Sequence, residues 1–289
     1  MDGAAPLYEC WRIGTKGARH GRNRDVELNL TGRSALITGS SKGIGLAIAK
    51  SLAAEGCDLH LAARTEATLR EAADEIAARY GVKVAIHPAD LSDGGEVKRV
   101  AAACRDVDIL VNSAGAIPRG TVLEIDEARW RKSWDLKVFG AINLTREIYG
   151  PMCQRGRGVI INIVGLSADR PDAYYIAGSC GNAALVMFSR SLGGDSIRHG
   201  VRVIAVNPGP VETEKHIADT ERLAQEKFGD KSRWRDVMSG LPMRRAATTD
   251  EVSGMVAFLC SDLASYISGS AITIDGGLLS DSAIGVKRG

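Results

Sequence analysis

SALITGSSKGIGLAIAKSLAAEG, residues 34–56, is the stretch of sequence that decides the fold. Residues 34–38 form a short apolar run typical of a buried strand, and residues 43–56 follow a helical pattern that stops at a glycine. The glycines between them permit a tight turn and let the backbone approach a pyrophosphate at the helix N-terminus. We therefore expect a dinucleotide to contact the residues of this turn, namely Gly39, Ser41, Lys42, Gly43, Ile44 and Gly45.

Outward from this unit, short apolar segments alternate with helical patterns. Further strands are predicted at 58–62, 82–87, 107–112, 158–164, 201–208 and 271–275, and further helices at 66–81, 94–104, 127–149, 181–196 and 249–261. Continuous apolar strands that alternate with helices indicate an α/β fold with a parallel sheet covered on both faces, and the short connections indicate one doubly wound, Rossmann-type domain over 31–280. A long polar segment with helical pieces, 212–247, interrupts the pattern, and we predict that it forms a lid over a ligand.

The two ends of the chain differ from this pattern. Residues 11–24 contain five basic residues, three glycines and no acid, so we predict a disordered basic tail over 1–30. An Arg-rich transit peptide fits this segment less well, because Asp2 and Glu9 lie in it. A second tail is predicted at 281–289.

The bulk composition excludes several classes of function. A net charge of +2 gives no reason to expect nucleic acid or an acidic membrane as a partner, and no apolar run approaches a membrane span. The six cysteines include no C-x-x-C pair, so no metal site is predicted. Scattered single cysteines are typical of a reducing compartment, and we expect a cytoplasmic protein.

Several motifs in order along the chain resemble the short-chain dehydrogenase/reductase family over about 31–280. They are TGSSKGIG (38–45), Asp90-Leu91, NSAG (112–115), NPGPVET (207–213) and SYISGSAITIDGG (265–277). The resemblance implies an oxidoreductase that transfers a hydride between a nicotinamide and a carbonyl or secondary alcohol, usually as a homo-dimer or homo-tetramer. It also implies contacts with the cofactor. Near the adenine these come from Asp90 and Leu91, and along the middle of the cofactor from Asn112, Ala114 and Gly115. Around the nicotinamide they come from Pro208, Gly209, Val211 and Thr213.

The expected cofactor is NADP rather than NAD. An NAD enzyme places a carboxylate at the end of the second strand, where it accepts from the ribose hydroxyls. Here that position is Ala63, followed by Arg64, and Lys42 lies in the glycine turn. Two cations suit a 2′-phosphate, which they bind through charge-assisted hydrogen bonds. Glu66 follows the strand end, and an acid there favours the start of the next helix.

The catalytic positions implied by the resemblance hold unusual residues. In the family, an asparagine, a serine, a tyrosine and a lysine form the chemical centre, and the tyrosine exchanges a proton with the substrate oxygen. The flanking motifs place these positions at Lys137, Gly165, Gly178 and Asn182. None of the usual residues is present, and losing a positioned general acid typically lowers the rate by about 10²–10⁴-fold.

Three interpretations follow from this replacement. In the first, Tyr175 is the proton donor, Lys137 lowers its pKa, and Asn182 binds the nicotinamide ribose through its amide. In that case a lysine near the open pocket indicates a polar or anionic group on the substrate. In the second, the protein binds NADP without turnover, as a sensor or a partner subunit. In the third, Tyr174 and Tyr175 are interface aromatics, and the small residues of 178–184 let two helices approach closely.

Overall fold

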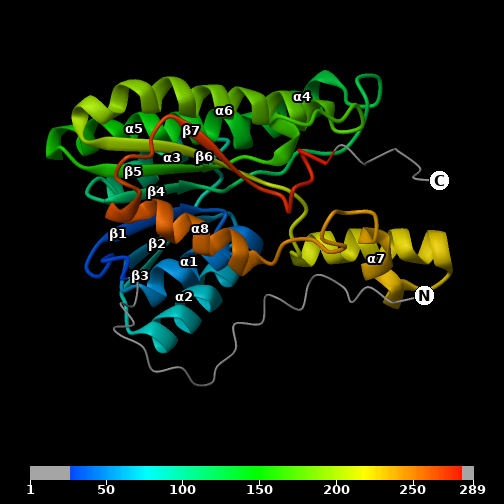
Figure 1. Cartoon of the computed structure of the whole chain (residues 1–289). Helices are drawn as coiled ribbons and strands as arrows, with labels where there is room; N and C mark the ends of the chain where they lie inside the picture. The colour runs from blue at the N-terminus through cyan, green and yellow to red at the C-terminus, as the bar shows by residue number, and fades with distance from the viewer. Residues whose placement is uncertain (1–26, 282–289) are drawn as a thin grey trace, which may run out of the picture.

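Parallel strands form a single sheet in the computed structural model, which describes residues 27–281 (Figure 1). The strands are β1 (Ser34–Thr38), β2 (Asp58–Ala63), β3 (Val84–Pro88), β4 (Ile109–Asn112), β5 (Gly158–Ile163), β6 (Val201–Pro208) and β7 (Ser270–Ile274). Their order is β3-β2-β1-β4-β5-β6-β7, and every neighbouring pair is parallel. The order reverses between β1 and β4, and doubly wound sheets bind ligands at the carboxyl ends of their strands beside such a switch point. The predicted fold class is confirmed.

Helices cover both faces of this sheet (Figure 1). One layer consists of α1 (Gly43–Ala54), α2 (Glu66–Tyr80) and α8 (Thr249–Cys260), and the other of α3 (Gly94–Ala103), α4 (Glu127–Trp134), α5 (Ala141–Arg155) and α6 (Ile176–Ser196). Fully buried side chains such as Ile48, Ile76 and Leu259 fill the first interface, and Val100 and Leu144 belong to the second. Successive side chains of a strand point to opposite faces of the sheet, so a continuously apolar strand contributes side chains to the hydrophobic cores on both faces.

Two predicted helices differ from the observed ones. The helix predicted at 181–196 begins earlier, at Ile176, because Gly178 and Gly181 weaken the helical pattern in the sequence but are both buried by packing. The helix predicted at 127–149 extends to Arg155 and contains a π-helical turn over Asp135–Gly140. A Cβ at Gly140 would lie 2.7 Å from the Leu91 carbonyl oxygen, so this turn packs directly against the loop after β3.

The insert after β6 forms a small helical unit. It contains α7 (Glu214–Phe228) and a 3-10 segment, Lys231–Met238, and Figure 1 shows α7 beyond the carboxyl ends of the strands. Ala224, Trp234 and Met238 give this unit a hydrophobic cluster of its own. The insert lies beyond this edge of the sheet, and its role as a lid stays a prediction.

The described part of the chain starts inside the predicted basic tail. Leu30 is fully buried, Leu28 packs against the same core, and the Leu30 carbonyl accepts a hydrogen bond from Cys57 Sγ at 3.4 Å. Residues 27–30 thus belong to the domain, which corrects the predicted tail boundary. The rest of that tail and 282–289 lie outside the described residues.

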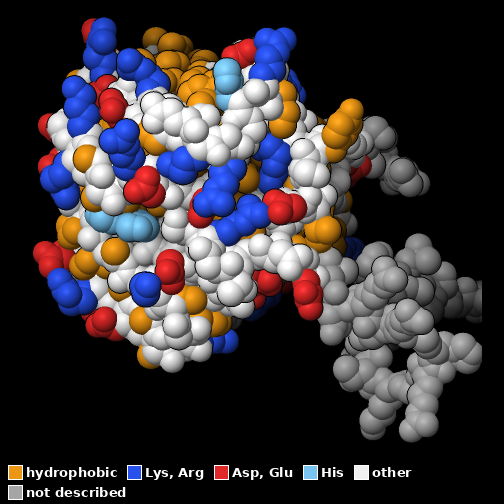
Figure 2. Space-filling model, turned by 90° about the vertical axis from the view of Figure 1, so that its left-hand side faces the viewer, with side chains coloured by type: hydrophobic (Ala, Val, Ile, Leu, Met, Phe, Trp, Pro, Cys, Tyr) orange, Lys and Arg blue, Asp and Glu red, His pale blue; other side chains and the backbone are white. Residues whose placement is uncertain are grey.

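The end of the molecule that carries the amino ends of the strands has mixed charge. Figure 2 faces this end, and basic and acidic side chains alternate over it. Ion pairs such as Arg33–Asp262, at 2.7 Å, and Arg157–Asp108, at 3.1 Å, lie among the loops that begin the strands. Within 27–281, none of the helices has the length and apolar character needed to cross a membrane.

Candidate active site

A cavity of about 1680 Å³ lies at the carboxyl ends of the strands. Its walls come from the β1–α1 turn, the end of β2, the loops after β4 and β5, and the segment from β6 into α7. The predicted cofactor residues that line it are Gly39, Ser41, Lys42, Gly43, Ile44, Gly45, Arg64, Leu91, Ala114, Gly115, Pro208, Gly209 and Thr213. The three predicted catalytic residues, Tyr175, Lys137 and Asn182, line the same cavity.

The glycine turn is held closely against the loop after β4. Gly39 has a φ of 67°, and a Cβ there would lie 2.9 Å from the Ala114 Cα. Thr38 Oγ1 accepts hydrogen bonds from the backbone N–H groups of Ser113, at 2.9 Å, and Ala114, at 3.0 Å. Thr38, for which the sequence predicted no role, thus joins two loops that line the cavity.

The N-terminus of α1 is open to an anion. No side chain caps it at Lys42, and its first turn contains no acid. By contrast, α3, α7 and α8 are capped by Asp93, Thr213 and Thr248. The first N–H groups of an uncapped helix need acceptors, and a pyrophosphate supplies them together with the charge that the helix dipole favours. The cavity therefore fits a dinucleotide at this end.

The wall at the end of β2 is basic. Arg64 and Lys42 line the cavity, and the strand ends at Ala63 without a carboxylate. Glu66, the acid that follows, lies in the first turn of α2 and pairs with Arg70 at 2.7 Å. The Glu66 carboxylate thus belongs to the first turn of α2, as the sequence predicted, and forms an ion pair within that helix.

Three predicted cofactor residues do not line the cavity. Asp90 accepts from both the N–H and the Oγ of Ser92, at 3.1 and 2.7 Å, and these hydrogen bonds lower the pKa of its carboxyl. Asn112 is buried, with its Nδ2 donating to Thr145 and to another buried asparagine on β5. Val211 is buried beside Ala247. The predicted contacts of these three residues with the cofactor therefore stay a prediction.

Tyr175 occupies the space beside Gly178. It lies at the N-cap position of α6, and a Cβ at Gly178 would overlap its ring atoms Cε1 and Cζ. The neighbouring Tyr174 is 68% exposed. The two tyrosines are therefore not equivalent, because only the ring of Tyr175 is turned back over the start of the helix.

Two further side chains fill space next to glycines in the same region. A Cβ at Gly165 would lie 2.9 Å from Asn182 Nδ2, and a Cβ at Gly115 would lie 2.5 Å from Lys137 Cδ. Asn182 Nδ2 donates to Ser167 Oγ at 2.8 Å. Its Oδ1 is buried without a hydrogen-bond partner among the described residues.

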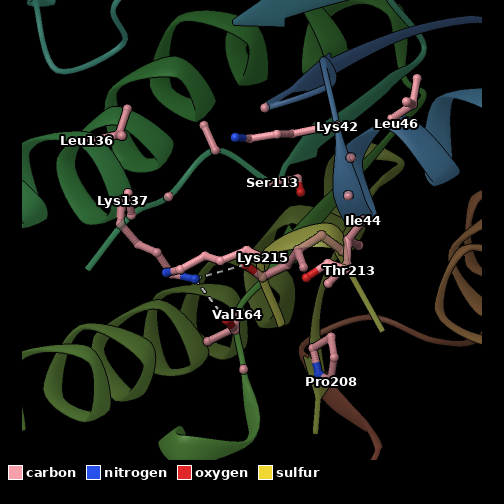
Figure 3. Close-up of a pocket in the computed structure, with 18 of the residues that line it drawn as sticks. Lys42, Ile44, Leu46, Ser113, Leu136, Lys137, Val164, Pro208, Thr213 and Lys215 are labelled. Atoms are coloured by element: carbon pink, nitrogen blue, oxygen red, sulfur yellow. Dashed lines mark hydrogen bonds between the residues drawn. The ribbon is translucent and has the colours of Figure 1, made fainter. Parts of the chain in front are cut away.

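Lys137 places a buried amine at the end of β5. Its Nζ donates to the carbonyl oxygens of Val164, at 2.8 Å, and Ile163, at 3.5 Å. Desolvation by burial lowers its pKa to about 8, so the amine gains or loses its proton near neutral pH. Figure 3 shows the side chains of Lys137 and Lys215 entering the pocket and pointing toward each other.

Arg119, and not Lys137, is the cation that acts on Tyr175. Burial raises the pKa of the Tyr175 phenol, and Arg119, with its Cζ 5.6 Å from the ring centroid, opposes that rise. Arg119 is fixed by an ion pair with Asp172 at 2.5 Å, and Gly120 N donates to Tyr174 O at 2.7 Å. The expected effect of Lys137 on the tyrosine pKa is thus wrong. Arg119 has no motif around it that marks it in the sequence, since only the packing of two loops brings it to the ring.

Comparison with known proteins finds relatives over most of the chain. Residues 39–279 match the family model described as enoyl-(acyl carrier protein) reductase. Nodulation protein G of Rhizobium sp. (strain N33) is 36% identical, over 86% of this chain and 98% of that relative, and acetoacetyl-CoA reductase of Allochromatium vinosum is 30% identical, over 85% and 98%.

Solved structures share the whole fold. L-sorbose reductase from Gluconobacter frateurii, complexed with NADPH and L-sorbose, superposes with a TM-score of 0.84 at 35% identity, covering 88% of this chain and 99% of that one. A protein described as a putative NAD(P)-dependent gluconate 5-dehydrogenase from Beutenbergia cavernae, with bound NADP, has a TM-score of 0.79 at 33% identity, covering 88% and 100%.

Proposed function

The chain belongs to the short-chain dehydrogenase/reductase family, and we propose that it is an NADP-dependent oxidoreductase with a rearranged active site. It transfers a hydride between the nicotinamide and a carbonyl or secondary alcohol. The observation that carries the proposal is the ring of Tyr175, which fills the space that a side chain at Gly178 would take. The position assigned to the family's tyrosine is glycine, and a phenol from the preceding turn takes that place.

The cofactor is NADP, held by residues that the cavity already brings together. The uncapped N-terminus of α1 accepts the pyrophosphate, and Lys42 and Arg64 pair with the 2′-phosphate. Asn182, which lines the cavity, hydrogen-bonds a ribose hydroxyl through its amide. The bound nicotinamide supplies the hydride in reduction and accepts it in oxidation. Two solved relatives contain NADPH or NADP, which supports this assignment.

Tyr175 exchanges the proton. Because burial raises the pKa of its phenol, Tyr175 is protonated at neutral pH and can donate to a carbonyl oxygen. The phenolate that remains is stabilised by the guanidinium of Arg119. Lys137 provides a positive charge at the end of β5, where it stabilises negative charge on the substrate oxygen.

The substrate carries a polar or anionic group. Four basic residues line the cavity, namely Arg119, Arg170, Lys137 and Lys215. Within residues 27–281, Arg119 is the one of these that forms a salt bridge, with Asp172. Basic side chains around a partly enclosed cavity favour a carboxylate, a phosphate or several hydroxyl groups. L-sorbose and acetoacetyl-CoA, which the names of two relatives specify, have such groups.

Nucleotide binding and turnover test the proposal separately. NADPH and NADH are titrated into the protein by fluorescence, and a panel of polar ketones and aldehydes is then screened for loss of the reduced-nicotinamide absorbance. We expect tighter binding of NADPH and turnover with at least one compound. Binding of NADPH without oxidation across the panel supports the alternative of a cofactor-binding protein, and binding of neither nucleotide contradicts both.

Two tyrosine variants then test the proton donor. Tyr175→Phe is expected to lower kcat by about 10²–10⁴-fold, the usual loss on removing a general acid, with NADPH affinity unchanged. Tyr174→Phe is the matched control, because that ring is exposed and adjacent. Equal kcat values in the two variants would remove Tyr175 from the mechanism.

A further inference from the structure

Two histidines and a cysteine converge at the edge of the sheet. His60 is on β2, His87 is on the edge strand β3, and Cys104 follows α3. His60 Nδ1 lies 2.9 Å from His87 Nε2, and Cys104 Sγ lies 3.5 Å from the same nitrogen. One ligand atom from each of the three lies within 4.8 Å of the others. None of the three residues lines the cavity at the carboxyl ends of the strands.

His87 Nε2 cannot form a full hydrogen bond with both of its neighbours, His60 Nδ1 and Cys104 Sγ. A neutral imidazole nitrogen has either one lone pair or one N–H, so His87 Nε2 serves only one of its two neighbours at a time. His87 is 9% exposed and Cys104 is 1% exposed, so water replaces the missing partner poorly there. A cation placed among the three atoms accepts a lone pair from each of them.

The spacing fits a transition-metal ion. With Zn–N distances of about 2.0–2.1 Å and a Zn–S distance of about 2.3 Å, tetrahedral coordination places two nitrogens roughly 3.3 Å apart and a nitrogen and a sulfur roughly 3.6 Å apart. The two nitrogens are 2.9 Å apart, His87 Nε2 and Cys104 Sγ are 3.5 Å apart, and all three ligand atoms lie within 4.8 Å of one another, so the side chains must rotate to bring them to one ion. Imidazole and thiolate ligands together favour Zn²⁺ over Mg²⁺ or Ca²⁺.

We propose that His60, His87 and Cys104 form a Zn²⁺ site with three protein ligands. His60 is partly exposed, so the fourth position faces solvent and takes water or a small ligand. Zinc displaces the thiol proton of Cys104, which leaves to solvent, and the thiolate then binds the metal. Because its ligands come from β2, β3 and the end of α3, the ion ties the edge strand to the helix that covers it.

The site is tested on the full chain after dialysis against a chelator. Zn²⁺ is titrated in competition with a chromophoric chelator, and we expect one tight equivalent. Cys104→Ser, His87→Gln and His60→Gln should each weaken this equivalent by at least roughly 100-fold, since even second-shell changes cost 10–100-fold. His60→Gln carries the least risk to folding, because its side chain is partly exposed. Circular dichroism confirms that each variant is folded.

Matched controls separate this site from other thiols and imidazoles. Cys180→Ser and His199→Gln change exposed residues outside the cluster and should keep the tight equivalent. Cys10→Ser tests the thiol in 1–26, which lies outside the described residues. Co²⁺ in place of Zn²⁺ should give a thiolate-to-metal charge-transfer band that Cys104→Ser abolishes. An unchanged equivalent in Cys104→Ser, or no tight binding by the unmodified protein, overturns the proposal.

Discussion

Gly178 and Tyr175 depend on each other at the start of α6. The ring of Tyr175 is placed where any side chain at position 178 would project, so glycine is required there for a steric reason. Asn182 beside Gly165 and Lys137 beside Gly115 repeat the same relation. At the scale of single residues, three groups of the site, Tyr175, Asn182 and Lys137, each lie beside a glycine.

A methyl group at position 178 tests this dependence. Gly178→Ala should destabilise the protein by about 1–3 kcal/mol, the usual cost of overpacking, and should lower turnover because the Tyr175 ring is displaced. Gly254→Ala is the matched control. A Cβ at the exposed Gly254 on α8 meets no atom within 4 Å, so alanine should stabilise the helix by roughly 0.5–1 kcal/mol. Urea unfolding measures both, and a neutral Gly178→Ala would contradict the packing argument.

The buried amine of Lys137 predicts a specific pH dependence of stability. Burial lowers its pKa from 10.5 to about 8, so between these values the unfolded chain holds a proton that the folded chain has released. Raising the pH through this window therefore favours folding, and relative to Lys137→Met the wild-type free energy of unfolding should rise by up to about 3 kcal/mol. Lys132→Met, which changes an exposed lysine, is the control. If the free energy of unfolding changed with pH in the same way for wild type and Lys137→Met, the amine would be solvated in the folded protein and the prediction would be wrong.

At the scale of elements, α1 combines a stability defect with a binding function. Its N-terminus has no side-chain cap, like those of α2 and α6, whereas Asp93 and Thr248 cap α3 and α8. A helix that must bind phosphate keeps its first N–H groups free, and this costs stability in the absence of the nucleotide.

An added cap should therefore have opposite effects on folding and on binding. Lys42→Asp places a carboxylate at the N-cap of α1 and should stabilise the free protein by about 1 kcal/mol. It should also weaken NADPH binding, because the carboxylate occupies the N–H groups and repels the phosphates. Lys42→Ala controls for the loss of the lysine charge. Thermal melts and fluorescence titrations measure the two effects, and unweakened NADPH affinity in Lys42→Asp would show that the phosphates bind elsewhere.

Element boundaries show where the sequence was informative. The strands were predicted within two residues because apolar runs bounded by turns depend on local pattern alone. The start of α6 was missed because its first turn contains glycine and serine, and the π-helical turn that carries Lys137 leaves no periodic signal. Packing against neighbouring loops determined both.

At the scale of the whole molecule, we propose that the chain assembles as a homo-dimer or homo-tetramer. The small residues Gly178, Ser179 and Gly181 are buried within the chain itself and do not provide a flat outer face. Phe139 and Met187, however, are 48% and 59% exposed on the helical layer that contains α5 and α6. Exposed large apolar side chains on helices favour association.

Light scattering coupled to gel filtration tests this assembly. The wild-type protein should elute as a dimer or tetramer, and Phe139→Lys with Met187→Lys should shift it to lower mass, because two buried charges would oppose the contact. Leu223→Lys is the control, because Leu223 is also an exposed apolar residue but lies on α7, and it should leave the mass unchanged. A monomeric wild-type protein, or an unchanged mass in the double variant, contradicts the proposed interface.

The sequence by itself determined the parallel α/β sheet, the glycine turn at the dinucleotide site and the family, since these depend on periodicity and on spacing within short segments. It also indicated the basic residues Lys42 and Arg64 beside that turn. Only the tertiary structure placed Tyr175 over Gly178, brought Arg119 to the tyrosine ring and joined His60, His87 and Cys104 at one point. Side chains in those groups come from separate strands, loops and helices. Their distances are set by how the elements pack, and no spacing along the chain encodes them.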